Sequence, residues 1–400
     1  MINIAVLGYG TVGSGVVEVI DTNSTEISSR LGEDIRVKYI LDLRDFPGDP
    51  HEAQVVHDIE IIFADPDISV ICETMGGMEP AYTFTKKALE KGISVCTSNK
   101  ELVAAHGPGL IKLAESNGCS YLFEASVGGG IPIIRPLNKA LTAEHIQSIT
   151  GILNGTTNYI LTHMDEDGVG FEDILKEAQR LGYAERNPEA DVEGHDAARK
   201  IAILSSLMCG SNVRYEDIYM EGITGITPED FKYAHALGMS IKPLALSRET
   251  DDGFFAMVAP FMIESSHPLY MVKDVYNAVF VSGNTLGDTM YYGRGAGKLP
   301  TASAVVSDVV DCARHPGKTV ACVWNEQDVR LTGIDEYKCR FFVRVSADKK
   351  NDADAVFGEV KAVDAGISGE YAFITGVMSN ADFDAACGKV GGVISRIRTF

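Results

Sequence analysis

The chain has 400 residues, of which 45% are hydrophobic; this is enough to bury more than one core, and we expect two or three domains. Its 35 Lys and Arg against 56 Asp and Glu give a net charge of −21, which argues against nucleic acid or an anionic membrane as the main partner. The start of the chain lacks a basic signal segment, and no window approaches the roughly 18 apolar residues of a membrane-spanning helix. The eight cysteines form no CxxC pattern, so we interpret them as reduced thiols of a cytoplasmic protein.

The first 130 or so residues alternate short apolar runs with helical patterns. Strands are predicted at 3–7, 35–42, 69–75 and 93–98. A glycine turn joins the first strand to a helix, and a helical stretch at 80–92 separates the last two strands. Strands that alternate with helices indicate a parallel sheet. We therefore predict an α/β protein that begins with a Rossmann-type, doubly wound domain over residues 1–132.

After residue 132 the pattern changes to isolated strands mixed with long helices. Strands are predicted at 146–153, 255–263 and 278–284, and helices at 171–181 and 192–209. We expect an α+β domain for substrate binding and dimerisation over 133–295. Residues from about 296 to 325, which contain a helix with a proline near its start, are expected to complete the first domain. Residues 336–400 alternate strands with helices, which predicts a small ferredoxin-like module.

The sequence Gly8-Tyr9-Gly10-Thr11-Val12-Gly13 places a GxGxxG pattern between a predicted strand and a predicted helix. The first glycine permits a tight turn, the second lets the backbone approach a pyrophosphate, and the third lets helix and strand pack closely. Glycines also serve ordinary turns. The strand–turn–helix context nevertheless predicts that this loop binds NAD or NADP.

The second predicted strand ends in a stretch that contains Asp42, Arg44 and Asp45. A carboxylate at this position accepts hydrogen bonds from the adenosine ribose of NAD, whereas Arg44 would favour the 2′-phosphate of NADP. Because both kinds of side chain are present, the sequence leaves the choice of cofactor open.

Lys100 follows the fourth predicted strand, in the stretch TSNKELVA. The carboxyl ends of parallel strands line the ligand crevice, so we expect Lys100 near the nicotinamide; the alternative is a surface lysine. A second glycine-rich stretch, GRGAGKLPTAS at 293–303, precedes a helix. It would complete the cofactor pocket or, alternatively, form a tight surface loop.

The uncharged run ILNGTTNYIL at 152–161 carries two amides and two threonines after a predicted strand. A helix cap would explain Thr156 or Thr157, but it gives Asn154 no role. The functional alternative is a set of polar groups around an amino-acid substrate.

Six ionisable side chains crowd into ADVEGHDAARK at 190–200. Asp191 is a good N-cap for a helix that continues into the apolar residues after 200, and Asp196 and Lys200 then lie one turn apart on the same face. The simple alternative is a solvated ion pair. A metal site is disfavoured because one histidine among consecutive carboxylates lacks the HExxH spacing.

Taken together, these motifs resemble those of homoserine dehydrogenases over residues 1 to about 312. The matching stretches, in the family's order, are GYGTVGSGV, ETMGG, TSNKELVA, EASVGGGIPII, GILNGTTNYIL, LGYAERNPEADVEGHDAARK, PEDFKYAHALG and GRGAGKLPTASAVVSD. The resemblance implies reversible NAD(P)-dependent reduction of L-aspartate 4-semialdehyde to L-homoserine, on the route to threonine and methionine. It also implies a homo-oligomer, either a dimer or a tetramer, that acts on small molecules.

The resemblance assigns roles to individual residues. The catalytic pair falls on Asp196 and Lys200, and a second essential lysine falls on Lys100. The substrate contacts fall on Glu185 and Asp191, to which the polar run adds Asn154 and Thr156. The cofactor positions are Gly8, Gly10, Thr11, Val12, Gly13, Arg44, Thr74, Gly76, Ser98, Lys100 and Gly295. Lys200 would stabilise the negative charge that hydride delivery builds on the aldehyde oxygen.

Family members also bind a structural sodium ion, which maps here to Glu124 and the carbonyls of Val127, Gly129 and Ile131. One carboxylate and a glycine-rich turn supply hard oxygen ligands that suit a hard cation.

The chain departs from the family pattern in two places. Only His51 follows Arg44 where many members carry a further basic residue for the 2′-phosphate, so a preference for NADP is in doubt. The C-terminal module stands where many members carry a regulatory ACT domain, but it lacks the usual D-x-P-G turn. It is therefore expected to be ACT-like, with either a regulatory or a structural role.

Two rival classes fit part of the sequence. One is another semialdehyde or hydroxy-acid dehydrogenase of similar build. The other is a cofactor-binding sensor with a decayed site, which would have lost Lys100, Asp196 or Lys200; all three are present.

Overall fold

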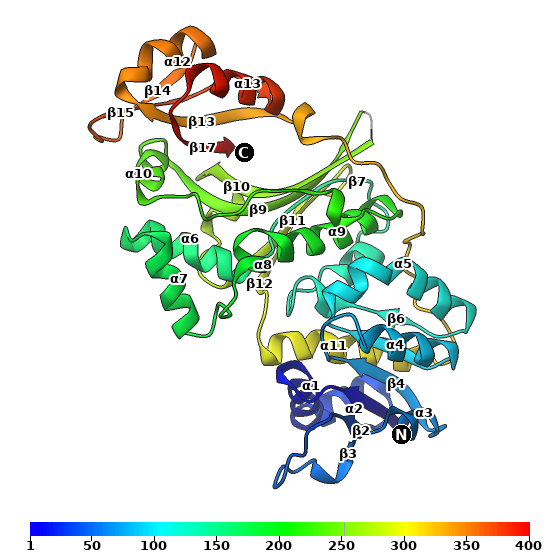
Figure 1. Ribbon diagram of the computed structural model, residues 1–400. Helices are drawn as coiled ribbons and strands as arrows, with labels where there is room; N and C mark the ends of the chain where they lie inside the picture. Colours follow the sequence, from blue (N-terminus) through cyan, green and yellow to red (C-terminus); the bar gives the residue numbers. More distant parts are fainter. Residues whose placement is uncertain (252) are drawn as a thin grey trace. The chain divides into compact units, whose positions relative to one another are not determined.

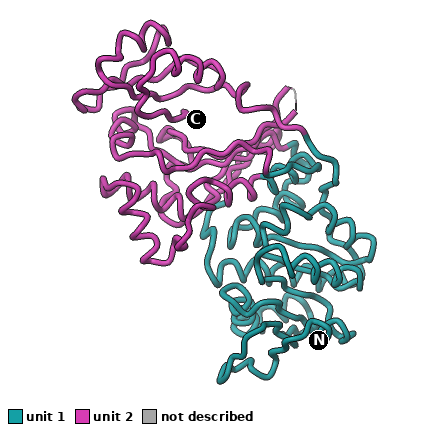
Figure 2. The backbone as a smooth tube through the Cα atoms, in the orientation of Figure 1, with its two compact units in different colours: residues 1–145, 202–215, 291–329 teal, residues 146–201, 216–290, 330–400 magenta. Residues whose placement is uncertain are grey.

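The computed structural model describes residues 1–251 and 253–400, and the chain divides into two compact units (Figures 1 and 2). Unit 1 contains residues 1–145, 202–215 and 291–329, and unit 2 contains residues 146–201, 216–290 and 330–400. The C-terminal residues thus belong to unit 2, and the predicted returning segment 296–325 lies within unit 1. Among the described residues, no helix is both long enough and apolar enough to cross a membrane.

Unit 1 is built on a parallel sheet with the strand order β3-β2-β1-β4-β5-β6. Its strands are β1 (Ile2–Leu7), β2 (Ile35–Leu41), β3 (Val55–Val56), β4 (Ile68–Glu73), β5 (Ser94–Thr97) and β6 (Tyr121–Leu122). Its helices are α1 (Thr11–Thr22), α2 (Ser24–Leu31), α3 (Ile59–Phe63), α4 (Ala81–Glu90), α5 (Lys100–Ser116) and α11 (Lys298–Arg314). The order reverses beside β1, so the predicted Rossmann-type, doubly wound sheet is confirmed.

Helix α11 packs against α1 although almost 300 residues separate them in the chain (Figure 1). Gly15 of α1 lies so close to α11 that an added Cβ would stand 2.8 Å from the carbonyl oxygen of Lys298. Val16 and Val17 share one apolar core with Val305 of α11 and with the parallel strands. The close packing of two helices on the same core explains how residues 291–329 complete unit 1.

Unit 2 is built on a mixed sheet with the path β12-β11-β7-β9-β10-β17-β13-β15-β14. The strands are β7 (Ile146–Ile152), β8 (Tyr219–Met220), β9 (Met239–Thr250), β10 (Gly253–Glu264), β11 (Tyr276–Gly283), β12 (Gly287–Arg294), β13 (Lys338–Ser346), β14 (Lys361–Val363), β15 (Glu370–Ile374), β16 (Met378–Ser379) and β17 (Val393–Thr399). The helices are α6 (Gly155–Asp167), α7 (Phe171–Arg180), α8 (Glu189–Val192), α9 (His195–Cys209), α10 (Pro228–Ala236), α12 (Lys350–Phe357) and α13 (Asn380–Val390). The chain passes between the units within α9 and within β12, so residues 202–209 of α9 and 291–294 of β12 belong to unit 1.

The C-terminal residues form a β-α-β-β-α-β unit with the strand order β17-β13-β15-β14. Strand β17 also pairs in parallel with β10, so this unit continues the sheet of the preceding residues. Arg344 of β13 is buried and donates to Asp230 of α10 and to Glu370 of β15, both at 2.8 Å. Backbone pairing and buried ion pairs therefore fix the C-terminal residues to the rest of unit 2.

Two helix starts differ from the prediction. Asp191 is not an N-cap but lies inside α8, and α9 begins at His195 because Gly194, with φ of +90°, separates the two helices. Helix α6 is capped by Asn154, whose Oδ1 accepts a hydrogen bond from the Thr157 N–H at 2.8 Å, and not by a threonine.

Candidate active site

A buried cluster of polar side chains lies in unit 2 where β7 ends and where α6 and α9 begin. Lys200 Nζ donates to Asp196 Oδ2 at 2.7 Å and to the carbonyl oxygen of Leu153 at 2.8 Å. Asn154 Nδ2 lies 2.8 Å from both Asp191 Oδ1 and Asp196 Oδ2. The cluster thus joins one ammonium group, two carboxylates and one amide.

The pair is not the solvated pair of the simple alternative, because Asp196 is 3% exposed and Lys200 is 9% exposed. Burial of two charges is costly unless they are paired and hydrogen bonded. The one-turn spacing on α9 brings the two side chains together, and Asn154, as the cap of α6, adds a donor to Asp196. The prediction that Asp196 and Lys200 meet on one helix face is confirmed.

The loop that contains Glu185 is anchored to neighbouring helices. Thr156 Oγ1 donates to the carbonyl oxygen of Tyr183 at 2.7 Å, and Gln179 Nε2 donates to that of Glu185 at 3.0 Å. The Glu185 side chain is exposed. Because the Thr156 hydroxyl is bound to the loop, Thr156 holds the backbone beside Glu185. Gln179 was missed by sequence reasoning, since a lone glutamine on an amphipathic helix gives no signal.

The glycine-rich loop of unit 1 has the geometry of a dinucleotide-binding turn. A Cβ on Gly13 would stand 1.8 Å from the carbonyl oxygen of Gly8, whereas a Cβ on Gly10 would meet no heavy atom within 4 Å. Gly10 is the N-cap of α1 and has no side chain to satisfy the first N–H groups of the helix. These N–H groups and the open space at Gly10 suit a pyrophosphate. Thr74 stabilises the loop, because its Oγ1 donates a hydrogen bond to the Gly8 carbonyl oxygen at 2.9 Å.

At the end of β2, Asp42 and Arg44 bind each other. The Arg44 side chain donates to both carboxylate oxygens of Asp42, each at 2.9 Å, and the backbone N–H groups of Arg44 and Tyr9 donate to the same carboxylate at 3.0 and 2.8 Å. Hydrogen bonds from Arg44 hold the pKa of the Asp42 carboxyl far below its usual range. The carboxylate therefore has all four of its acceptor positions in use, while Arg44 is 62% exposed.

The remaining predicted cofactor residues follow adjacent strands. Thr74 is the first and Gly76 the third residue after β4, and Ser98 is the first residue after β5. Lys100 is the first residue of α5, whose N-cap is Asn99. Gly295 lies in unit 1 against the turn at 128–130, where a Cβ on Gly129 would stand 2.3 Å from the Gly295 carbonyl oxygen.

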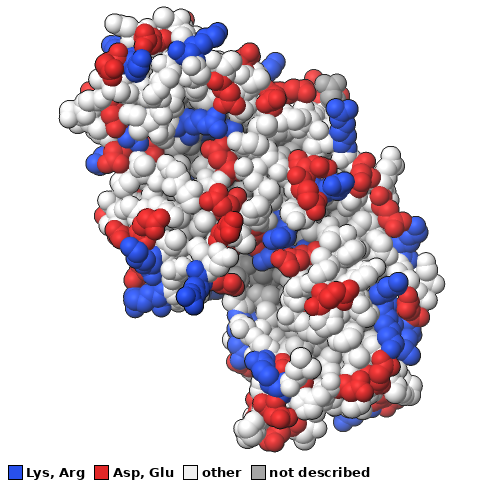
Figure 3. Space-filling model, viewed as in Figure 1, with Lys and Arg blue, Asp and Glu red and all other residues white. Residues whose placement is uncertain are grey.

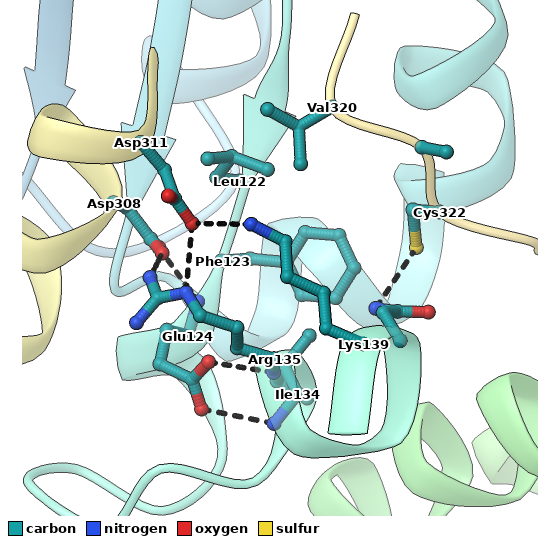
Figure 4. A pocket seen from close by; sticks show the side chains of 12 residues that line it. Leu122, Phe123, Glu124, Ile134, Arg135, Lys139, Asp308, Asp311, Val320 and Cys322 are labelled. Carbon is teal, nitrogen blue, oxygen red and sulfur yellow. Dashed lines mark hydrogen bonds and ion pairs between the residues drawn. The ribbon is translucent and has the colours of Figure 1, made fainter. Parts of the chain in front are cut away.

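The carboxylate of Glu124 accepts three backbone N–H groups, from residues 133–135, at 2.6 to 2.9 Å (Figure 4). Beside it, Arg135 lies between Asp308 and Asp311, next to a cavity of about 30 Å³. Burial and the neighbouring Glu124 raise the pKa of Asp308 to about 8. Both carboxylate oxygens of Glu124 are thus hydrogen bonded to the backbone, and these bonds fix the end of the 124–131 turn.

Charged side chains of both signs lie interspersed on the face of the molecule seen in Figure 3. A Rossmann-type sheet with an open glycine loop is typical of NAD(P)-dependent oxidoreductases. The family model for homoserine dehydrogenase matches residues 132–310, and the model for the homoserine dehydrogenase NAD-binding domain matches residues 8–124. The chain belongs to the homoserine dehydrogenase family.

Individual relatives agree with this assignment. The homoserine dehydrogenase of Neisseria gonorrhoeae is 45% identical over 90% of this chain and 85% of its own length, and that of Helicobacter pylori is 40% identical over the same shares. Among solved structures, a homoserine dehydrogenase from Thiobacillus denitrificans has a TM-score of 0.90 at 36% identity, covering 100% of this chain and 98% of that chain. A hyperthermophilic archaeal homoserine dehydrogenase mutant in complex with NADPH has a TM-score of 0.67 at 29% identity, covering 78% of this chain and 97% of that chain. The protein interconverts L-aspartate 4-semialdehyde and L-homoserine with NAD(P).

Proposed function

We propose that Lys200 is the residue that carries the proton in this reaction. The nicotinamide, when bound, supplies or accepts the hydride. Reduction of the aldehyde builds negative charge on its oxygen, so an ammonium group aimed there stabilises the transition state and delivers the proton. Asp196 fixes the direction of the Lys200 side chain through the 2.7 Å contact, which is the observation that supports the proposal. Lys100 is proposed as the second lysine, for proton transfer or for holding the substrate.

Glu185 and Asp191 are proposed to bind the α-ammonium group of the substrate. Asn154 supports this role because its side chain donates to both Asp191 and Asp196. It therefore holds the Asp191 carboxylate next to the Asp196–Lys200 pair. Thr156 contributes by holding the loop that contains Glu185.

Substitution of either carboxylate is expected to weaken the binding of homoserine and not that of the cofactor. Glu185→Gln and Asp191→Asn should each raise the KM for homoserine by about tenfold or more, the usual effect of removing one charged hydrogen-bond partner, with the cofactor KM changed less than about twofold. Glu189→Gln, at an exposed position of the same segment, is the matched control. A change in the cofactor KM alone would contradict the assignment. Turnover of homoserine against other hydroxy acids tests the substrate itself.

The residues of unit 1 fit a dinucleotide. The loop of Gly8, Gly10, Thr11, Val12 and Gly13 is proposed to hold the pyrophosphate at the start of α1. Thr74, Gly76, Ser98, Lys100 and Gly295 are proposed to contact the rest of the cofactor. At the ribose, Arg44 neutralises Asp42, so a 2′-phosphate would meet no net repulsion and would have an exposed guanidinium to bind. We therefore propose that both NAD and NADP are used.

The Asp42–Arg44 pair allows the cofactor choice to be shifted in either direction. Arg44→Ala exposes the Asp42 carboxylate and should shift the ratio of kcat/KM toward NAD by about tenfold or more, whereas Asp42→Ala releases Arg44 and should shift it toward NADP by a similar factor. Homoserine oxidation with each cofactor measures the ratio, with Arg30→Ala on α2 as the exposed control. Equal losses of kcat/KM with both cofactors would show that the Asp42–Arg44 pair does not distinguish a 2′-hydroxyl from a 2′-phosphate.

A structural sodium ion is also proposed at the 124–131 turn. In the part of the chain that the structure describes, the carbonyl oxygens of Val127, Gly129 and Ile131 accept no hydrogen bond, which suits cation binding. The carboxylate of Glu124 already accepts hydrogen bonds from three N–H groups. The proposal therefore rests on the three backbone carbonyl oxygens. A cytoplasmic homo-oligomer, dimer or tetramer, and an ACT-like role for residues 336–400 are proposed on family resemblance.

A further inference from the structure

Glu73 is a fully buried carboxylate, with 0% exposure, that none of the roles above uses. It is the last residue of β4, and the parallel registers pair it with Leu7 at the end of β1 and with Thr97 at the end of β5. Glu73 therefore stands in the middle of the three adjacent strand ends from which the cofactor loops emerge. This edge of a doubly wound sheet is where dinucleotides bind.

The carboxylate of Glu73 links two of these loops. Its Oε1 accepts the backbone N–H of Met75 at 2.8 Å, and its Oε2 accepts the hydroxyl of Thr97 at 2.6 Å. One side chain thus binds both the 74–77 loop after β4 and the residues that begin the loop after β5.

The network continues on both sides of Glu73. Thr97 Oγ1 accepts the backbone N–H of Asn99 at 2.9 Å, and Asn99 Nδ2 donates to the carbonyl oxygen of Gly77 at 2.6 Å. Asn99 also caps α5, which begins at Lys100. Together with the backbone between Glu73 and Gly77, these hydrogen bonds form a closed ring that sets the backbone at Thr74 and Gly76 relative to that at Ser98 and Lys100.

A carboxylate is the side chain best suited to this position. It offers about four acceptor sites and no donor, which matches a site where N–H and O–H groups converge. Burial is expensive for such a group, and desolvation raises the pKa of the Glu73 carboxyl despite its hydrogen bonds. Costly buried groups that serve no apolar packing are typical of functional sites.

We propose that Glu73 is a positioning residue for the cofactor. It holds the two loops after β4 and β5 in the one relative arrangement in which Thr74, Gly76, Ser98 and Lys100 meet the same NAD(P) molecule. This inference rests on the proposed cofactor contacts of those four residues. It adds a residue that touches neither cofactor nor substrate and acts through the backbone.

The test compares Glu73→Gln, Glu73→Ala and Thr97→Val with the wild type and with Glu90→Gln, a control at an exposed residue of α4. Fluorescence titration measures the dissociation constants of NADH and NADPH. Steady-state assays at saturating cofactor measure the KM for homoserine, and calorimetry measures the melting temperature. Glu73→Gln should raise both dissociation constants by about threefold or more and Glu73→Ala by about tenfold or more, with the KM for homoserine changed less than about twofold. The melting temperature of Glu73→Gln should change little, because the cheaper burial of a neutral amide offsets the hydrogen bond that its NH2 group cannot accept.

The double variant distinguishes a shared network from two separate effects. Because Glu73 and Thr97 act through one hydrogen bond, the losses in Glu73→Gln/Thr97→Val should be less than additive. Cofactor binding within about twofold of the wild type in both Glu73 variants, or a loss that follows the melting temperature alone, would overturn the inference. Failure of the wild type to bind either cofactor would instead overturn the proposed function. If Glu73→Ala does not fold, the Gln and Val variants decide the question.

Discussion

Lys200→Ala is expected to abolish turnover while leaving the cofactor affinity nearly unchanged. The variant loses both the charge that stabilises the alkoxide and the proton donor, and each effect of this kind contributes about 10² to 10³ in rate. We therefore expect kcat to fall by about 10³-fold or more, with the dissociation constant of NADH within about twofold of the wild-type value. Steady-state homoserine oxidation and fluorescence titration measure the two quantities.

Loss of Lys200 also removes the ion pair of the buried Asp196, so stability must be separated from chemistry. Removal of one member of a buried ion pair costs about 3–5 kcal/mol. Lys200→Ala/Asp196→Asn also removes the charge of residue 196 and should recover most of that free energy of unfolding without recovering activity. Lys176→Ala, on the exposed face of α7, is the control for lysine removal. Activity restored together with stability in the double variant would contradict a chemical role for Lys200.

Gly13→Ala and Gly10→Ala are expected to fail in different ways. The Cβ at position 13 would stand 1.8 Å from the Gly8 carbonyl oxygen, so α1 must move away from β1. We expect Gly13→Ala to lower the melting temperature and to weaken cofactor binding by about 100-fold or more, because the turn proposed to hold the pyrophosphate is displaced.

Position 10 is open, and its φ of −86° is one that alanine readily adopts. The melting temperature of Gly10→Ala should therefore lie within about 1 °C of that of the wild type. The variant should nevertheless bind NADH about tenfold more weakly, because the methyl group occupies the space proposed for the pyrophosphate. Calorimetry of the protein without cofactor and fluorescence titration separate the two effects. Normal cofactor binding by Gly10→Ala would mean that the pyrophosphate lies elsewhere.

Much of the fold was predictable because its signals are local. The apolar runs of β2, β4 and β5 and the turn at Gly8–Gly13 mark a parallel sheet directly. Strand β9 was missed because both of its faces are buried over most of its length, and a continuous apolar run has no alternation by which to recognise it. The pairing of β17 with β10 was also unpredictable, since register across 130 residues depends on tertiary packing.

The site was predictable in its residues more than in its geometry. The spacing of Asp196 and Lys200 predicts their contact, because one helical turn brings such side chains together. Spacing could not predict that Asn154, 42 residues before Asp196, donates to it. Spacing also could not predict that Arg44 and the Tyr9 N–H together occupy the acceptor positions of the Asp42 carboxylate. Those contacts depend on how the loop after β2 folds back. Such contacts between distant segments arise only once the sheet has formed.

The measurement that tests the central claim most directly is a crystal structure of the protein with NAD(P) and homoserine bound. The account predicts the homoserine hydroxyl oxygen within about 3 Å of Lys200 Nζ, with the α-ammonium group against Glu185 and Asp191. Homoserine bound with its hydroxyl more than about 5 Å from Lys200 Nζ would contradict the assignment of Lys200 as the residue that transfers the proton.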